Sequence, residues 1–256
     1  VFIVGFAAAL LVLLYLNRAV IDSADILGDA GNALIPVSIA GLGALIASRQ
    51  PRNRIGWILL AIAAANAVNL MAALVAIRLQ LAGGPFSGWA MWVAWFQSWS
   101  WLVYFPAGLM VLLFLLLPDG RLPGRRWRWL AWADLVLTPA LMTLAAADPF
   151  PVRLSPRLPP LRNPVGLPLL AQSTAGDVIG SVILVPALVL LLLTIVALLL
   201  RLVRSRGDER QQLKWIVYVC TTVIVVMAVG GVLQAIQLDP RGKGVVVAAP
   251  LGIGVA

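Results

Sequence analysis

The chain offers very few side chains that could carry out chemistry. It contains no histidine and a single cysteine, Cys220. Metal sites, acid–base catalysis and proton relays built on histidine are therefore excluded, and no intramolecular disulfide can form. The sequence also holds no His-Glu-x-x-His zinc motif and no pairing of a nucleophile with histidine. We therefore expect neither a catalytic site nor a metal or cofactor site in residues 1–256.

Asp134 is the one acidic residue inside a predicted membrane span. A carboxylate at the centre of a bilayer costs about 2.5–3.5 kcal/mol on insertion scales, and such residues are functional candidates by default. Asp134 also follows the basic residue Arg128 by only one to two helical turns. A structural ion pair with a basic loop residue is therefore one interpretation, and a role in signalling or proton sensing is the other.

Further polar and aromatic side chains mark two predicted spans. Asn66 and Asn69 share one helical face, and Gln97 lies in the next span. Interhelical hydrogen bonds, worth about 0.6 kcal/mol each on average, explain such amides, with a ligand pocket as the alternative. The stripe of Trp89, Trp92, Phe96 and Trp99 indicates an aromatic interface belt or a pocket for a lipid or hydrophobic effector. The candidate sensing residues are Asn66, Asn69, Gln97, Trp99 and Asp134.

Membrane-spanning helices must position these residues. Hydrophobic residues make up 62% of the chain and only 11% are charged, whereas about a quarter of the residues in a soluble domain are charged. About 20 apolar residues cross a bilayer as a helix. We predict an all-α, polytopic transmembrane helical bundle in a single domain, 1–256, with about eight spans of which the first and last are truncated. The spans are 1–16, 30–47, 55–77, 89–117, 129–147, 178–200, 215–236 and 245–256.

Basic residues are distributed unequally over alternate loops. Of the 19 Lys and Arg residues, twelve fall on one side of the predicted threading and seven on the other. Because basic loops face the cytoplasm, we predict cytoplasmic N- and C-termini in the inner (cytoplasmic) membrane of a bacterium. The net charge of +9 lies mostly in short loops beside apolar spans. This pattern favours a lipid bilayer with anionic headgroups as the partner and argues against nucleic acid.

The connection 148–174 on the other side is the only long one and holds seven prolines. Proline density of this kind forbids a helix and favours extended backbone. We interpret the connection as a stiff strap across the mouth of the bundle, with a lid over an external pocket as the alternative. Three prolines within spans, Pro106, Pro139 and Pro186, should bend their helices.

Three basic loops on the predicted cytoplasmic side have patterned sequences. Asn53 is suited to cap the third span, and Gly56 allows a neighbouring helix to approach. In the second loop, Asp119-Gly120 and Pro123-Gly124 predict two tight turns before a run of arginines. In the third loop, Asp208 is expected to cap the seventh span.

In this order the loops resemble those of the multi-spanning membrane region of bacterial sensor histidine kinases of actinobacterial type. The resemblance rests on Asn53, Ile55, Gly56, Trp57, Pro118, Asp119, Gly120, Arg121, Arg125, Arg126, Arg210, Gln211, Gln212, Lys214 and Trp215.

The resemblance implies a membrane-embedded signal-input region that relays a membrane or extracytoplasmic stimulus to a cytoplasmic kinase module. It also implies a homodimer, for which small residues such as Ala40, Gly43 and Ala47 permit close helix contact. ATP and a response regulator would be bound only by an output domain beyond residue 256, so the parent protein would be an ATP-dependent histidine kinase. A small-molecule transporter or permease is the alternative function.

Overall fold

The computed structural model describes residues 2–18, 20, 23–83, 87–118, 120–122, 124–149, 151–155, 157–167, 175–204 and 218. The chain divides into two compact units, Val1–Ala197 and Leu198–Ala256. Within the described residues every regular element is a helix, and the only β pairing is an isolated bridge between Val152 and Leu161. The predicted all-α class is confirmed there, whereas the predicted spans 215–236 and 245–256 fall outside the described residues, apart from Tyr218.

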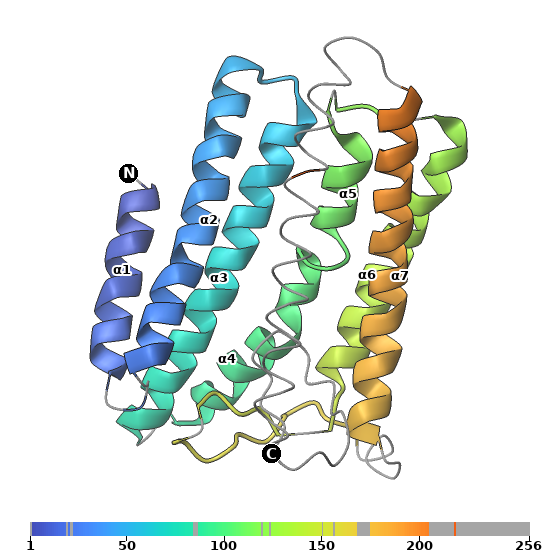
Figure 1. The fold of residues 1–256 in the computed structure, drawn as a ribbon. Helices are drawn as coiled ribbons and strands as arrows, with labels where there is room; N and C mark the ends of the chain where they lie inside the picture. Colours follow the sequence, from blue (N-terminus) through green and yellow to red (C-terminus); the bar gives the residue numbers. More distant parts are fainter. Residues whose placement is uncertain are drawn as a thin grey trace, which may run out of the picture. The chain divides into compact units, whose positions relative to one another are not determined.

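Figure 1 shows the helices, coloured in chain order. Most are rich in apolar residues such as Ala and Leu, which favour a helix. These are α1 (Phe2–Asn17), α2 (Ser23–Arg49), α3 (Arg54–Ala82), α4 (Ser87–Ser100), the 3-10 helix η2 (Trp101–Val103), α5 (Leu109–Leu116), the 3-10 helix η3 (Arg125–Trp127), α6 (Arg128–Ala146) and α7 (Ala175–Arg204). Within the part of the chain that the structure describes, three segments are long and apolar enough to cross a membrane: Arg54–Ala82, Arg128–Ala146 and Val185–Val203. A helix suits this environment because all of its inner backbone groups bond within the segment.

The helices α2 and α3 form a close antiparallel pair. A Cβ atom placed on Gly56 would lie only 2.7 Å from the backbone nitrogen of Ala47, and one on Gly43 would lie 3.0 Å from the carbonyl oxygen of Gly56. The two backbones approach this closely because glycine has no side chain. The predicted role of Gly56 is confirmed. Gly43 and Ala47, which were expected to permit helix contact, make that contact with α3 of the same chain.

The predicted span 89–117 is not one continuous helix, because the chain is broken in its middle, beside Pro106, where a bend was expected. The helix α4 ends at Ser100, η2 follows, and α5 starts only at Leu109. Pro106 has no backbone N–H to continue a helix. Gly108 has a φ of 61°, and a Cβ atom there would collide with the carbonyl group of Val103. The sequence stays apolar across this break, so hydropathy does not indicate it. Only Pro106 and Gly108 mark its position in the sequence.

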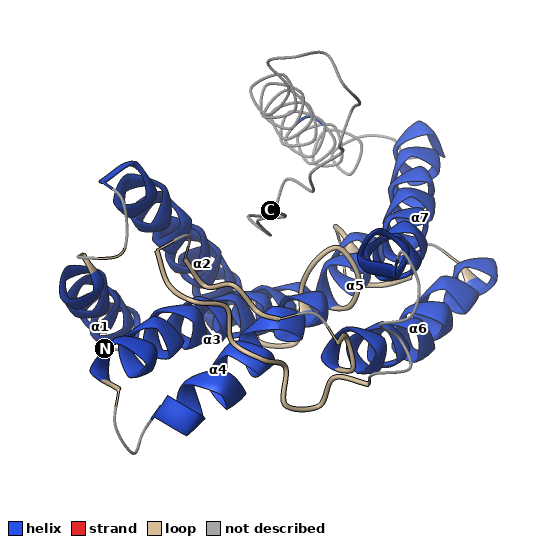
Figure 2. Ribbon diagram, turned by 90° about the horizontal axis from the view of Figure 1, so that it is seen from below, coloured by secondary structure: helices blue, strands red, loops and turns tan. Residues whose placement is uncertain are grey.

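A strap, residues 148–167, crosses the end of the first unit at which α6 stops (Figure 2). The Gln80 side chain donates to the carbonyl oxygen of Pro159 at 2.6 Å, and the Ser155 hydroxyl donates to that of Val20 at 2.9 Å. The Asn163 amide donates to the carbonyl oxygen of Ala146 at 3.1 Å. These bonds fix the strap to three separate parts of the chain and agree with the predicted strap; residues 168–174 lie outside the described residues.

Candidate functional site

The first patterned loop is held by its own side chains. The Asn53 carboxamide oxygen accepts from the backbone N–H of Ile55 at 3.0 Å, which is the predicted N-terminal cap of α3. Its amide group donates to the Gln50 side chain at 3.0 Å. The Trp57 indole donates to the carbonyl oxygen of Pro51 at 3.0 Å while 58% of the side chain stays exposed. The indole therefore has a fixed position at the end of the helix pair.

The second patterned loop packs onto the first. Gly120 has a φ of 76°, donates its N–H to the carbonyl oxygen of Leu116 at 2.7 Å, and so turns the chain after α5. A Cβ atom on Gly120 would lie 3.2 Å from the Asn53 carboxamide oxygen. The loops are far apart in the sequence, so this contact shows that the fold brings both to one end of the first unit.

The rest of the second loop is anchored in the core. Leu122 and Trp127 pack against a buried cluster formed by Val111, Leu115, Leu130, Leu190 and Ala197. Pro118 is partly buried, whereas Asp119 and Pro123 lie outside the described residues. Gly124 has extended backbone, with φ at 162°, in place of the second predicted turn. The third loop, with Arg210, Gln211, Gln212, Lys214 and Trp215, also lies outside the described residues.

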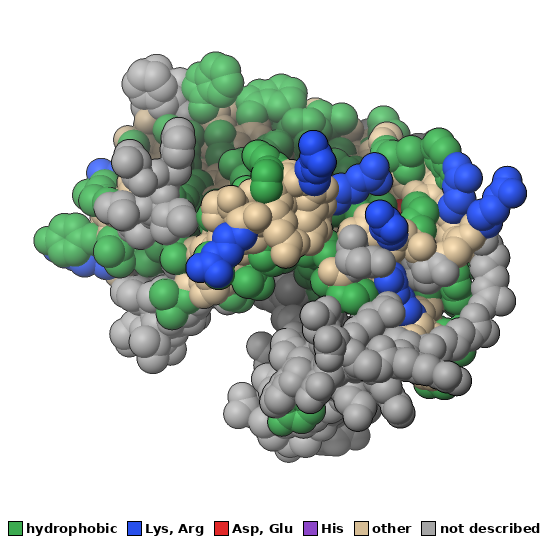
Figure 3. Space-filling model, turned by 90° about the horizontal axis from the view of Figure 1, so that it is seen from above, with side chains coloured by type: hydrophobic (Ala, Val, Ile, Leu, Met, Phe, Trp, Pro, Cys, Tyr) green, Lys and Arg blue, Asp and Glu red, His purple; other side chains and the backbone are tan. Residues whose placement is uncertain are grey.

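Basic side chains gather on the face formed by the two loops (Figure 3). We call residues 49–57 together with 120–128 the loop surface. Its exposed arginines are Arg49, Arg52, Arg54, Arg121, Arg125 and Arg128, and Arg126 belongs to η3. Neither segment contains an aspartate or a glutamate. The charged side chains of these two segments are therefore all positive, and Asp119, which lies outside the described residues, directly precedes the second segment.

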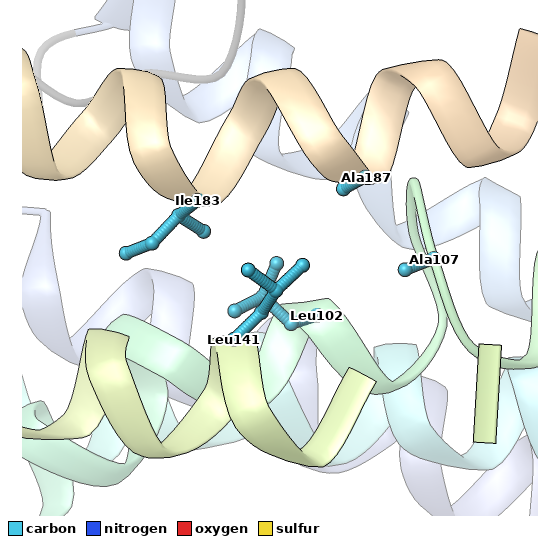
Figure 4. Packing of buried hydrophobic residues seen from close by; sticks show 5 residues of the cluster. All are labelled: Leu102, Ala107, Leu141, Ile183 and Ala187. Carbon is cyan, nitrogen blue, oxygen red and sulfur yellow. The ribbon is translucent and has the colours of Figure 1, made fainter. Parts of the chain in front are cut away.

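The break between α4 and α5 lies in the buried core. Leu102 of η2 and Ala107 pack with Leu141 of α6 and with Ile183 and Ala187 of α7. In Figure 4 Leu102, Leu141 and Ile183 point into the same space between these helices. Irregular backbone at membrane depth is tolerated only where protein buries it. The packing on α6 and α7 supplies that cover.

Asp134 lies at this break and is only 2% exposed. Its carboxylate accepts from the backbone N–H of Gly108 at 2.8 Å and from the Thr138 hydroxyl at 3.0 Å. The Thr138 oxygen lies 3.1 Å from the same Gly108 N–H. Because Asp134 and Thr138 are one turn apart on α6, both reach the start of α5.

The expected ion pair between Asp134 and a basic loop residue is therefore replaced by a different arrangement. The partners of the carboxylate are a backbone amide and a hydroxyl, and Arg128 is exposed at the start of α6. A negative charge at the N-terminus of a helix is favourable, since the first amide groups have no partner within the helix. The sequence does not reveal this role, because the break that creates the free amide is not visible in it.

The predicted amides of α3 bind the neighbouring part of the broken span. The Asn69 amide is buried and donates to the carbonyl oxygen of Gln97 at 2.9 Å and to the Ser100 hydroxyl at 2.8 Å. The Asn66 side chain lies near the Tyr104 hydroxyl. The Asn69 bonds are the interhelical hydrogen bonds expected from the sequence, although Gln97 contributes its backbone oxygen.

Three residues of the predicted aromatic stripe form a connected set of edge-to-face contacts through Trp95: Trp92, Phe96 and Trp99. Trp95, which the sequence analysis missed, lies 5.8 Å from Trp92 and 5.5 Å from Trp99 between ring centroids. Its indole donates to the carbonyl oxygen of Ala146 at 2.8 Å. Trp95 follows Trp92 at a helical spacing, which was the signal available. The Trp99 indole nitrogen is buried with no hydrogen-bond partner among the described residues.

Trp89 and Trp92 are 63% and 45% exposed, which suits the interface-belt interpretation. Among the described residues, no cluster of three or more His, Cys, Asp or Glu side chains could hold a metal ion. No protein-family model, curated protein or solved structure matches this chain.

Proposed function

We propose that residues 1–256 are the membrane-embedded signal-input region of a two-component sensor histidine kinase in a bacterial inner membrane. One observation carries the proposal: Gly120 of the second loop packs on Asn53 of the first. These are two of the three segments on which the resemblance to sensor kinases rests, and a shared surface is what an input region needs for passing a signal onward. The proposal includes about eight spans with both termini in the cytoplasm.

The packing supports one route for the proposed signal. Stimuli at the outer end would act on the strap and on the aromatic side chains of α4. The next element, the break at Tyr104–Gly108, lies near Asn66 of α3 and is bonded to α6 through Asp134. The short helix α5 then leads directly to the loop surface. A stimulus can shift this assembly between two arrangements only by its difference in affinity for them.

The chemistry of the proposed kinase belongs to the part that would follow residue 256. That part would bind ATP, carry the phosphoaccepting histidine and recognise the response regulator, and dimerisation would place two copies together. Residues 1–256 would contribute binding and mechanical coupling, with Asn66, Asn69, Gln97, Trp99 and Asp134 closest to the coupling path.

Phosphorylation of the intact gene product tests the proposal. Membrane vesicles containing the full-length protein should incorporate label from γ-labelled ATP into an acid-labile, alkali-stable phosphohistidine. Substituting the histidine that carries the label should abolish incorporation while insertion is unchanged. A gene that encodes another apolar span or a stop codon in place of a cytoplasmic helix after residue 256 would overturn the proposal.

A transporter is the second candidate, and the broken span favours it. Transporters bind their substrates at discontinuous helices whose ends point into the middle of the membrane. Here α5 begins in such a break, with the buried Asp134 at its N-terminus. The sequence shows no internal repeat that would supply a second broken span. Proteoliposomes distinguish the candidates, because a sensor should leave ion and solute gradients intact whereas a transporter should dissipate them.

A further inference from the structure

We propose that the loop surface is a discrete binding site for the headgroup phosphate of anionic phospholipids. The inference does not depend on the sensor function. It concerns a site with fixed geometry, which is a stronger statement than the general excess of basic residues on one side of a membrane protein.

The first argument is that the loop surface is held rigidly. An excess of basic residues orients a protein by their number alone and requires no defined positions. Here the side chain of Asn53 fixes the start of α3, and Trp57 bonds to Pro51. The second loop is held by Leu122 and Trp127, which pack into the core. The arginines of the two loops therefore extend from backbone segments that are held in place by hydrogen bonds and by packing into the core.

The second argument is charge. Arg52, Arg54 and Arg125 are exposed, and the segments 49–57 and 120–128 contain no acidic residue. A planar guanidinium group donates two parallel hydrogen bonds to a phosphate, and arginine stays charged at any physiological pH. Several guanidinium groups on the loop surface would attract a headgroup with one negative charge and would repel a cationic headgroup.

The third argument identifies lipid, and not an acidic protein, as the occupant. Arg54 and Arg128 are the first residues of α3 and α6, at the level where these apolar helices begin. The exposed indoles of Trp57, Trp129 and Trp132 lie beside them, with exposed fractions of 58%, 53% and 60%. Tryptophan is enriched at the depth of the lipid headgroups. The arginines therefore lie where phosphates of the adjacent leaflet are found.

Lipid binding to the purified chain in detergent tests the site. Native mass spectrometry would compare phosphatidylglycerol with phosphatidylcholine of the same acyl chains. The triple variant R52Q/R54Q/R125Q is matched by R78Q/R153Q/R162Q, which removes the same charge from exposed arginines at the other end of the first unit. Each arginine near a charged surface contributes about fivefold, so the first variant should lose roughly 100-fold of the preference for phosphatidylglycerol. The second variant should stay within about twofold of the parent chain.

Two competitors identify the occupant. Inorganic phosphate and a polyglutamate peptide, each at millimolar concentration, should leave phosphatidylglycerol binding unchanged. Displacement by phosphate would assign the surface to a free anion, and displacement by polyglutamate would assign it to an acidic protein; either result overturns the proposal. An equal loss in both triple variants would show that only net charge matters and would also overturn it. If circular dichroism shows that a triple variant is unfolded, the single substitutions replace it, with about fivefold expected for each of R52Q, R54Q and R125Q.

Discussion

Two acceptors converge on one backbone amide at the break between α4 and α5. The Gly108 N–H lies 2.8 Å from the Asp134 carboxylate and 3.1 Å from the Thr138 hydroxyl. Such redundancy is informative because a buried amide without any acceptor costs about 1–3 kcal/mol. Either side chain alone can satisfy the amide, so the energetic consequence should appear only when both are removed.

We therefore expect Thr138→Val and Asp134→Asn to lower the free energy of unfolding by less than about 1 kcal/mol each. The double variant Asp134→Ala/Thr138→Val should lose about 1–3 kcal/mol more than the sum of Thr138→Val and Asp134→Ala, because it alone leaves the amide unpaired. Unfolding in mixed micelles, followed by circular dichroism, measures these values. Thr143→Val is the control, since its exposed hydroxyl donates only within α6, to Pro139. Additive effects in the double variant would refute the shared-acceptor arrangement.

Alanine substitutions at two glycines with positive φ allow the cost of backbone strain to be distinguished from the cost of a steric collision. Gly83 has a φ of 62° with nothing within 4 Å of a Cβ atom, whereas Gly108 has a φ of 61° and lies against the carbonyl group of Val103. Gly83→Ala should cost only the strain of a backbone conformation with positive φ and a ψ of −158°, which is adopted almost exclusively by glycine, about 1–3 kcal/mol. Gly108→Ala should add about 1–3 kcal/mol for overpacking. Equal losses for the two variants in the same unfolding measurement would show that the break is not tightly packed.

At the scale of elements, the approach of α2 to α3 depends on the absence of a side chain at Gly56. A Cβ atom there would lie 2.7 Å from the backbone of Ala47, and backbone atoms cannot move aside as a flexible side chain would. The contact sits next to Ile55, Leu59 and Ile62, which form a buried cluster with Leu113 of α5. A disturbance of the helix pair should therefore reach the loop surface.

We expect Gly56→Ala to destabilise the chain by about 1–3 kcal/mol, since it forces the two helices apart. Gly41→Ala is the matched control on α2, because a Cβ atom there meets nothing within 4 Å. It should be neutral or stabilise the helix by up to about 1 kcal/mol. Thermal unfolding in detergent compares the pair. A Gly56→Ala chain as stable as the control would mean that α2 and α3 are further apart than the structure places them.

The elements also show how far sequence reasoning reaches. Apolar length and the cap at Asn53 were sufficient to locate α3, and the proline-rich connection was sufficient to indicate the strap. A bend at Pro106 was predicted, but the complete division of 89–117 into α4 and α5 was not, because hydropathy averages over the residues on both sides of Pro106. The partner of Asp134 was missed for the same reason: Gly108 has a free N–H only once the span is known to be broken.

For the molecule as a whole, the path of the chain predicts that the two ends of the first unit face opposite sides of the membrane. Gly120 against Asn53 places two loops at one end, while the strap bonds to Gln80 and Val20 at the other. Charged loops do not cross a bilayer spontaneously, since a charged side chain at its centre is strongly unfavourable. The two ends should therefore be accessible from opposite sides of the membrane, and only from those sides.

Cysteine labelling in intact cells checks this arrangement. In a Cys220→Ser background, Arg52→Cys and Arg125→Cys should react with a membrane-impermeant maleimide only after the cells are opened. Arg153→Cys, in the strap, should react in intact cells, because its side chain is exposed and lies at the end that the proposed orientation places outside. Since the loop surface holds both loops at one end, Arg52→Cys and Arg125→Cys must behave alike whatever the orientation of the bundle. Labelling of those two positions from opposite sides would contradict the packing of Gly120 on Asn53, whereas reversal of all three positions would contradict only the assignment of the basic end to the cytoplasm.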